Sequence, residues 1–161
     1  MQKTLAMRLL EGKNVDYEAV TYPSSERDAT VVAEHLGVPA AQVFKTLVVL
    51  RELGKPLLAM IPADRQLDLK KMAKAIGEKK LQMASHDEAE KLTRLQVGGI
   101  SPLMLLNRGF EMILDENARA FDAIYLSAGI KGINLKVPVD GLLQVTGARV
   151  LDVAAGPGDE T

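Results

Sequence analysis

Two apolar runs joined by a short polar turn constrain the fold of this chain most strongly. Residues 43–50 (VFKTLVVL) and 57–62 (LLAMIP) are rich in aliphatic and β-branched side chains, and residues 52–56 (ELGKP) between them are typical of a turn. Near-continuous apolar runs of this length indicate strands that are buried on both faces. We therefore predict a β-hairpin at the centre of a sheet.

Helices are predicted where apolar residues recur every three or four positions between capping residues. Ser85 and Glu88 are placed to form a capping box at the start of one helix, so His86 between them needs no catalytic role. Asp28 is the predicted N-cap of another helix. That helix is predicted over residues 29–36, and the spacing predicts two further helical segments: residues 3–10 and 68–77.

The second half of the chain is predicted to be mostly sheet. No repeat, long linker or nucleotide-binding glycine motif divides the sequence. We therefore predict one compact α/β (α+β) domain over residues 1–154, built on a mixed, curved sheet, and a flexible tail over residues 155–161. The strands expected in this half are FEMIL (110–114), AIYL (123–126) and INLKV (133–137).

The composition narrows the chemistry that the chain can perform. Its 161 residues include no cysteine, which excludes a cysteine nucleophile. They include two histidines, which are few for a His-rich zinc site. No apolar run approaches the roughly 18 residues that a membrane helix needs. Residues 1–13 show helical spacing rather than a signal peptide. We expect a cytoplasmic protein without a membrane segment, a metal or a nucleotide cofactor.

Charge is balanced overall but uneven along the chain. The net charge of −1 excludes a uniformly basic coat for nucleic acid, yet residues 65–80 hold six basic and two acidic side chains. A local basic patch can engage a polyanion, and a solvated helix face is the alternative. Both interpretations of this segment stay open at this point.

Two irregular features are candidates for a functional site. Lys45 lies inside an apolar strand and by alternation shares a face with Val43, Leu47 and Val49. It is either a desolvated lysine with a function or a lysine at a strand end that reaches water. The adjacent glycines of residues 98–102 let a ligand approach main-chain N–H groups, although any loop can have this composition.

Four segments together resemble one enzyme family. They are Lys45-Thr46 in a strand, QLDLKK (66–71), GGISP (98–102) and YLSAGIKG (125–132), in this order and at these distances. The combination resembles the YbaK family of bacterial Cys-tRNA(Pro) deacylases, from the first helix to about Asp152. The resemblance implies the YbaK/prolyl-tRNA synthetase editing-domain fold, with a barrel-like mixed sheet flanked by helices.

The resemblance implies a trans-editing enzyme that cleaves the ester joining a wrongly attached cysteine to tRNA(Pro), with no cofactor and with prolyl-tRNA synthetase as a partner. The mechanism ascribed to the family has the substrate thiol attack its own ester carbonyl, which suits a chain without cysteine. Lys45 corresponds to the essential lysine, and Lys70, Lys71 and Lys74 become candidates for acceptor-stem contacts. Eight further residues correspond to the aminoacyl pocket: Tyr22, Thr46, Gly98, Gly99, Ile100, Ser101, Pro102 and Ser127.

The chain departs from the family pattern around this pocket. Met104 stands where the family usually has a glycine, and Asn134 stands where an Asp is often seen. Ala128 and Lys131 stand where Gly and Arg are common, and Arg27-Asp28 stands where many members carry an aromatic residue. A pocket for a different small amino acid is therefore an alternative, with Ala- or Ser-tRNA as substrate and water as nucleophile. A catalytically silent tRNA- or synthetase-binding module is the other alternative, and the sequence does not indicate an oligomeric state.

Overall fold

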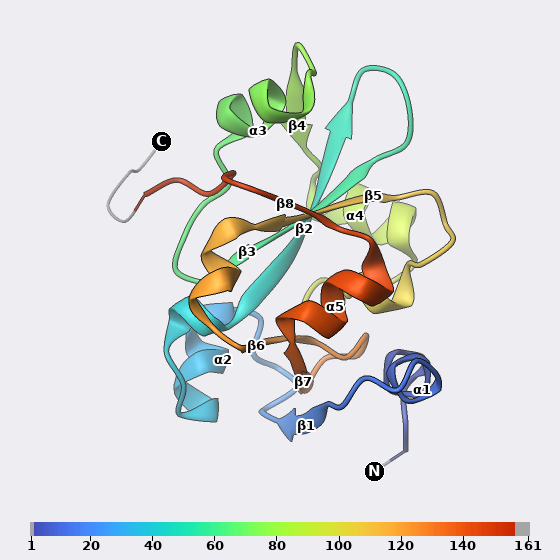
Figure 1. The fold of residues 1–161 in the computed structure, drawn as a ribbon, viewed down its shortest axis with the longest axis vertical. Helices are drawn as coiled ribbons and strands as arrows, with labels where there is room; N and C mark the ends of the chain where they lie inside the picture. Colours follow the sequence, from blue (N-terminus) through green and yellow to red (C-terminus); the bar gives the residue numbers. More distant parts are fainter. Residues whose placement is uncertain (1, 157–161) are drawn as a thin grey trace.

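The computed structural model describes residues 2–156 and contains two β-sheets with helices around them (Figure 1). The helices are α1 (Leu5–Gly12), α2 (Ala29–Leu36), α3 (Leu69–Ile76), α4 (His86–Thr93) and α5 (Val139–Thr146), with short 3₁₀ turns η1 (Ala40–Gln42), η2 (Pro102–Met104) and η3 (Glu116–Ala120). The strands are β1 (Glu18–Thr21), β2 (Phe44–Arg51), β3 (Leu57–Pro62), β4 (Leu81–Met83), β5 (Glu111–Asp115), β6 (Ala123–Ser127), β7 (Ile133–Pro138) and β8 (Arg149–Leu151).

The larger sheet has five strands in the order β4-β2-β3-β5-β8. The predicted hairpin is confirmed, because β2 and β3 pair antiparallel from Phe44↔Pro62 to Val49↔Leu57. β3 pairs parallel with β5, and β5 pairs parallel with β8, so this sheet is mixed as predicted.

The smaller sheet has three antiparallel strands in the order β1-β7-β6. It meets the larger sheet at a single parallel bridge between Val43 and Tyr125. The prediction of one barrel-like sheet is therefore wrong: the two sheets touch at this bridge and do not close. Hydropathy marks the strands themselves, whereas the place where neighbouring strands separate depends on packing that alternation does not encode.

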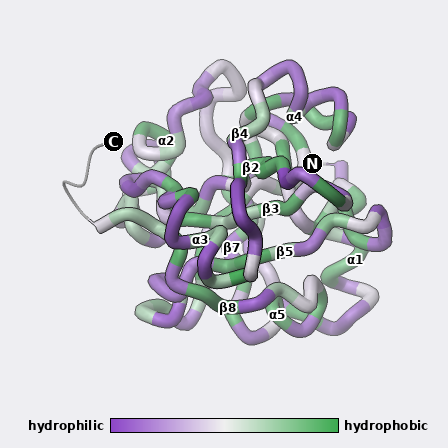
Figure 2. Tube along the Cα trace, turned by 90° about the horizontal axis from the view of Figure 1, so that it is seen from above, coloured by the Kyte–Doolittle hydropathy of each residue, from purple (hydrophilic) through white to green (hydrophobic). Residues whose placement is uncertain are grey.

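The core lies on both faces of β3, whose residues are all buried (Figure 2). Leu58 and Met60 pack in one cluster with residues of the smaller sheet, α1 and α5. Ile61 lies on the opposite face, in a cluster with Met72 of α3. The central hairpin is thus covered on both sides, which explains its near-continuous apolar sequence.

The predicted helix caps are confirmed in detail. Asp28 accepts hydrogen bonds from the N–H and the hydroxyl of Thr30, at 2.9 and 2.7 Å, and Gly37 ends α2 in a left-handed conformation. Ser85 and Glu88 form the expected capping box at α4. These caps fix where the loops around the helices begin, and two of those loops line the candidate site.

The C-terminal boundary of the predicted domain lies close to the end of the described residues. Ala155, the first residue of the predicted tail, is buried, and its N–H donates to the carbonyl of Gln66 at 2.8 Å. Residues 157–161 of that tail lie outside the described residues. Within residues 2–156, no helix has both the length and the apolar character needed to cross a membrane.

Candidate functional site

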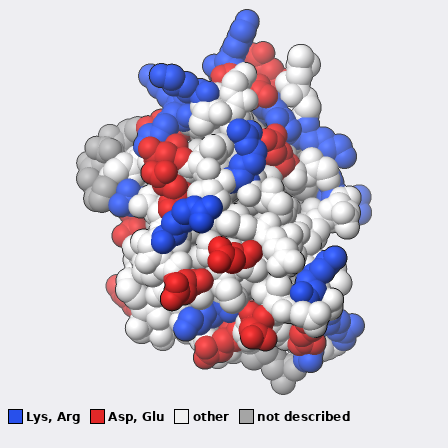
Figure 3. Space-filling model, in the orientation of Figure 1, with Lys and Arg blue, Asp and Glu red and all other residues white. Residues whose placement is uncertain are grey.

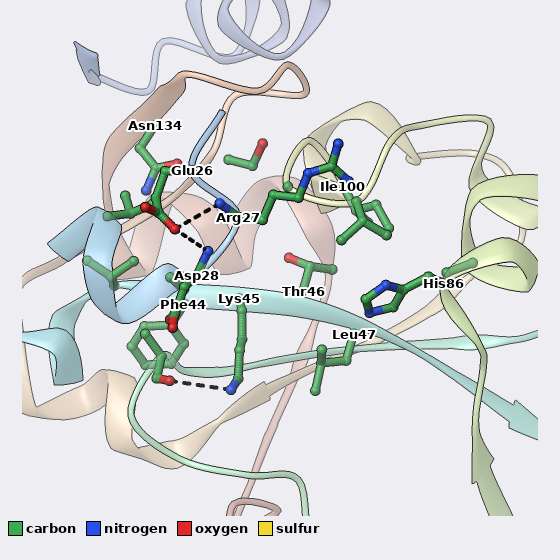
Figure 4. Close-up of a pocket in the computed structure, with 18 of the residues that line it drawn as sticks. Glu26, Arg27, Asp28, Phe44, Lys45, Thr46, Leu47, His86, Ile100 and Asn134 are labelled. Atoms are coloured by element: carbon green, nitrogen blue, oxygen red, sulfur yellow. Dashed lines mark hydrogen bonds between the residues drawn. The ribbon is translucent and has the colours of Figure 1, made fainter. Parts of the chain in front are cut away.

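A cavity of about 410 Å³ follows one edge of β2 and is lined by segments from both halves of the chain (Figure 4). Its size falls within the range of small-ligand pockets, about 300–1,000 Å³. Side chains from both faces of β2 reach it, because Phe44, Thr46 and Val48 line it together with Lys45 and Leu47. The cavity therefore wraps around the edge of the strand.

The edge of β2 is open here because two pairing partners leave a gap between them. The smaller sheet touches this edge only at Val43, and β4 begins to pair at Val49, with the N–H of Ala84 donating to the carbonyl of Val48 at 3.0 Å. Peptide groups two residues apart in a strand point the same way. The N–H and C=O of Thr46 therefore point away from β3 and into the gap.

Lys45 lies half-buried at the entrance to β2, on the face opposite Thr46 (Figure 4). Its Nζ donates a hydrogen bond to the carbonyl of Ala63 at 3.3 Å. Burial lowers the pKa of Lys45 below the usual lysine value, while the negative charges of Asp28 and Asp64 act in the opposite direction. The ammonium group is therefore held in place and easier to deprotonate than a surface lysine.

The smaller sheet supplies a polar wall of the cavity. Ser127 of β6 and Asn134 of β7 are cross-strand neighbours, and both line the cavity together with Tyr22. Asn134 is 5% exposed, and its side-chain amide has no hydrogen-bond partner among the described residues. Burial raises the pKa of the Tyr22 phenol. Within this wall the Ser127 hydroxyl accepts from the N–H of Gly129 at 3.1 Å, so the Asn134 amide is the group that stays available to a ligand among the described residues.

The glycine segment forms the opposite side, but only part of it reaches the cavity. Gly98, with a φ of +93°, and Ile100 line the cavity. Gly99 packs tightly behind them, since a Cβ there would lie 3.3 Å from both the Gln96 carbonyl oxygen and the Lys131 nitrogen. Ser101 and Pro102 are buried away from the lining, and the Ser101 hydroxyl accepts from the N–H of Leu103 at the start of η2.

Of the positions that depart from the family pattern, Arg27, Asp28 and Asn134 face the cavity. Met104 and Ala128 do not line it. Met104 packs against Gly129, where a Cβ would lie 2.4 Å from the Met104 Cγ. Lys131 lies behind the glycine segment, with its Cγ 3.3 Å from the position of a Cβ on Gly98.

The predicted basic residues of α3 are not part of the cavity. Lys70 and Lys74 are exposed on this helix, where Figure 3 shows basic side chains interspersed with acidic ones. Lys71 instead forms an ion pair with Asp152 at 3.0 Å and donates to the carbonyl of Ala154. Among the residues that the structure describes, Lys70 and Lys74 therefore have no ion-pair partner, whereas Lys71 has one.

Several lining residues were not predicted as site residues from the sequence, although the family resemblance places Arg27 and Asp28 near the pocket. Glu26, Arg27 and Asp28 line the cavity from the loop before α2, and His86 lines it from the first turn of α4. The two predicted N-caps mark where these loops end, but they do not show that both helices begin at the same cavity. That arrangement comes from the way the sheets separate.

The fold and the pocket are those of an aminoacyl-tRNA editing domain. The family model of that description matches residues 24–145, and the chain belongs to this family. The match includes every residue that lines the cavity except Tyr22.

Particular relatives agree with this assignment. The chain is 36% identical over 154 residues to a protein of Enterococcus faecalis named "Putative Cys-tRNA(Pro)/Cys-tRNA(Cys) deacylase EbsC", covering 94% of this chain and 93% of that protein. It is 29% identical over 94 residues to the proline–tRNA ligase of Thermodesulfovibrio yellowstonii, covering 58% of this chain and 16% of the ligase. A solved structure described as "a putative trans-editing enzyme for prolyl tRNA synthetase" superposes with a TM-score of 0.80 at 27% identity, covering 97% of this chain and 100% of that one.

Proposed function

We propose that this protein is a deacylase that removes cysteine from mischarged Cys-tRNA(Pro). The observation that carries the proposal is the half-buried Lys45 at an open strand edge, in the cavity that Gly98 and Ile100 also line. A protein that only bound tRNA would not need a partly desolvated ammonium group at this position, whereas an enzyme can use it to stabilise developing negative charge. The likeness to the Enterococcus faecalis protein over most of the chain supports the same substrate.

The substrate ester is bound by main chain and side chains together. In this proposal, the Thr46 N–H and C=O and the Asn134 amide hold the aminoacyl group through its amine and carbonyl. Lys45 and the glycine segment stabilise the oxyanion that forms when the ester carbonyl is attacked. Tyr22 and Ser127 complete the polar wall around the side chain of the bound amino acid.

The nucleophile in this proposal is the thiol of the substrate cysteine. The chain has no cysteine of its own. The thiol loses its proton as its sulfur forms a bond to the ester carbonyl carbon, the carbon–oxygen bond to the ribose breaks, and the departing ribose oxygen takes up that proton. The products are a cyclic thioester, which water then opens, and the free tRNA end. Because the attacking and reacting atoms belong to one bound molecule, correct orientation supplies much of the rate acceleration.

Asn134 favours a second candidate, deacylation of Ala-tRNA or Ser-tRNA by a bound water. The amide lines the cavity without a partner, so it can position a water as well as a substrate amine. This candidate uses the same cavity and differs in the nucleophile.

The proposed macromolecular partners are tRNA(Pro) and prolyl-tRNA synthetase. The match to 16% of a proline–tRNA ligase supports an activity that accompanies this synthetase. Lys70 and Lys74 are the proposed contacts to the acceptor stem, through its phosphates rather than its sequence.

The experiment is a deacylation assay of the purified protein against a panel of tRNAs charged with Cys, Ala, Ser or Pro. We expect fast release of cysteine from Cys-tRNA(Pro) and retention of proline on Pro-tRNA(Pro). Release of alanine or serine with cysteine retained would select the second candidate. Tight tRNA binding without release of any amino acid would identify a silent binding module and overturn the proposal.

A further inference from the structure

Arg27 is an uncompensated cation at the cavity. Its side chain is exposed and lines the cavity. In the part of the chain that the structure describes, its guanidinium forms no ion pair and no hydrogen bond. Figure 4 shows the side chain extending toward Ile100, on the same side of β2 as Thr46.

The backbone of Arg27 is held on both sides. One carboxylate oxygen of Glu26 accepts hydrogen bonds from the N–H of Arg27 at 3.1 Å and from the N–H of Asp28 at 2.9 Å. Asp28 in turn caps α2 through Thr30. The neighbouring carboxylates are therefore occupied with main-chain N–H groups, and neither is paired with the guanidinium.

The environments of Arg27 and Lys45 differ in a way that separates their roles. Lys45 is hydrogen-bonded to Ala63 and is influenced by the charges of Asp28 and Asp64. A phosphate is better bound by Arg27, whose guanidinium makes no hydrogen bond within the described residues, than by Lys45, whose ammonium already donates to Ala63. The planar guanidinium also matches two oxygens of a phosphate at once, which an ammonium group cannot do.

We propose that Arg27 binds the phosphate that joins the last two nucleotides of the tRNA. This inference rests on the proposed function, since an ester held at Lys45 and Thr46 places the terminal ribose, and hence its 5′ phosphate, toward the mouth of the cavity. Arg27 is then a substrate-positioning residue. It fixes the terminal nucleotide so that the ester stays at the open edge of β2.

The test combines a change in the protein with a change in the phosphate. The probe is tRNA(Pro) carrying cysteine through a stable amide, with the last internucleotide linkage either an ordinary phosphodiester or a neutral methylphosphonate. We expect Arg27→Gln to weaken binding of the ordinary probe about 10- to 100-fold, the range for a hydrogen bond to a charged group. Arg27→Gln and wild type should bind the neutral probe equally, and Arg27→Lys should fall between them on the ordinary probe.

Arg8→Gln is the matched control, because Arg8 is an exposed arginine of α1 that does not line the cavity. It should bind both probes like wild type. An equal loss on both probes in Arg27→Gln, or no loss on the ordinary probe, would overturn the role of Arg27. Deacylation of ester-linked Cys-tRNA(Pro) by the wild-type protein, measured in parallel, tests the proposed function separately. If the wild-type protein releases no cysteine, the proposed function fails. If it releases cysteine while Arg27→Gln binds the ordinary probe normally, only the phosphate contact fails.

Discussion

Lys45 donates a hydrogen bond from Nζ to the carbonyl oxygen of Ala63, 3.3 Å away. Ala63 follows the last residue of β3, and its own N–H donates to the carbonyl of Val43 at 2.7 Å. Ala63 therefore contacts two parts of the opposite segment: its N–H binds the carbonyl of Val43, and its carbonyl accepts from the Lys45 side chain. The ammonium group is positioned before any substrate arrives.

Replacement of Lys45 should remove activity without unfolding the protein. We expect Lys45→Ala to lower the single-turnover rate of deacylation at least about 100-fold, the loss typical for removal of one group that stabilises an oxyanion. Stability should change by less than about 1 kcal/mol, because the side chain is only half-buried. Lys45→Met keeps the aliphatic part of the side chain and should be equally inactive. Full activity in the Met variant, with an unchanged thermal unfolding midpoint, would show that Lys45 only reaches toward solvent.

The lowered pKa of Lys45 predicts a specific pH dependence. Because burial makes the folded-state pKa lower than that of the unfolded chain, the unfolded chain binds this proton more tightly. Lys45 therefore costs stability at pH values below its folded pKa, and this cost disappears as pH rises toward 10.5, the usual pKa of a lysine side chain. Activity that needs the ammonium form should fall over the same alkaline range.

Removal of the Asp64 charge should change the pH at which deacylation is lost on the alkaline side. The Asp64 charge raises the pKa of Lys45, so Asp64→Asn should shift the loss of deacylation to lower pH. The measurement is the pH profile of the single-turnover rate, corrected for spontaneous hydrolysis of the ester. Asp16→Asn, a change at an exposed aspartate outside the cavity lining, is the control. Identical profiles for the two variants would contradict a role for the protonated Lys45.

The nucleophile can be identified by changing the substrate. If the substrate thiol attacks, tRNA(Pro) carrying S-methylcysteine or serine should be nearly inert, since methylation removes the thiolate and a hydroxyl is a much poorer nucleophile near neutral pH. If water attacks, loss of the thiol should cost only about 1–3 kcal/mol in the transition state. Comparable single-turnover rates for the cysteinyl and S-methylcysteinyl substrates would exclude attack by the thiol.

The lysines of α3 should behave differently from one another. In a plot of the logarithm of tRNA affinity against the logarithm of salt concentration, Lys70→Glu and Lys74→Glu should each make the slope less steep by about one. Lys71→Ala should leave that slope nearly unchanged and cost at most about 1 kcal/mol of stability, because Lys71 is already paired with Asp152 at the surface. The measurement is tRNA affinity across a salt series. A salt-independent affinity in wild type would show that α3 is merely solvated.

The local elements of this fold could be predicted because their signals are local. Asp28, Gly37 and the Ser85–Glu88 capping box determine helix ends within a few residues, and the hairpin joins strands that are adjacent in sequence. The parallel pairing of β3 with β5 joins segments about 50 residues apart. Neither the hydropathy of Leu57–Pro62 nor that of Glu111–Asp115 specifies that partner.

The difference between local and long-range signals also explains which site residues were predicted. Lys45 and Gly98 are unusual in their own segments, so the sequence marks them as candidates, and the family resemblance supplies their expected roles. Ser101 and Pro102 share the glycine motif but are buried behind it, where the Ser101 hydroxyl caps a turn. Arg27 is one charged residue in a polar loop, and its place at the cavity depends on how α2 lies against the separating sheets.

The gap beside β2 has a consequence for retargeting the protein. The peptide group of Thr46 that faces this gap is present whatever side chain stands there, so main-chain recognition of an ester tolerates substitution. Phe44 and Val48 on one face, and Leu47 on the other, shape the room beside it. Substitutions at these three positions can therefore change the volume available to the side chain of the bound amino acid, while the main-chain groups that bind the ester stay constant.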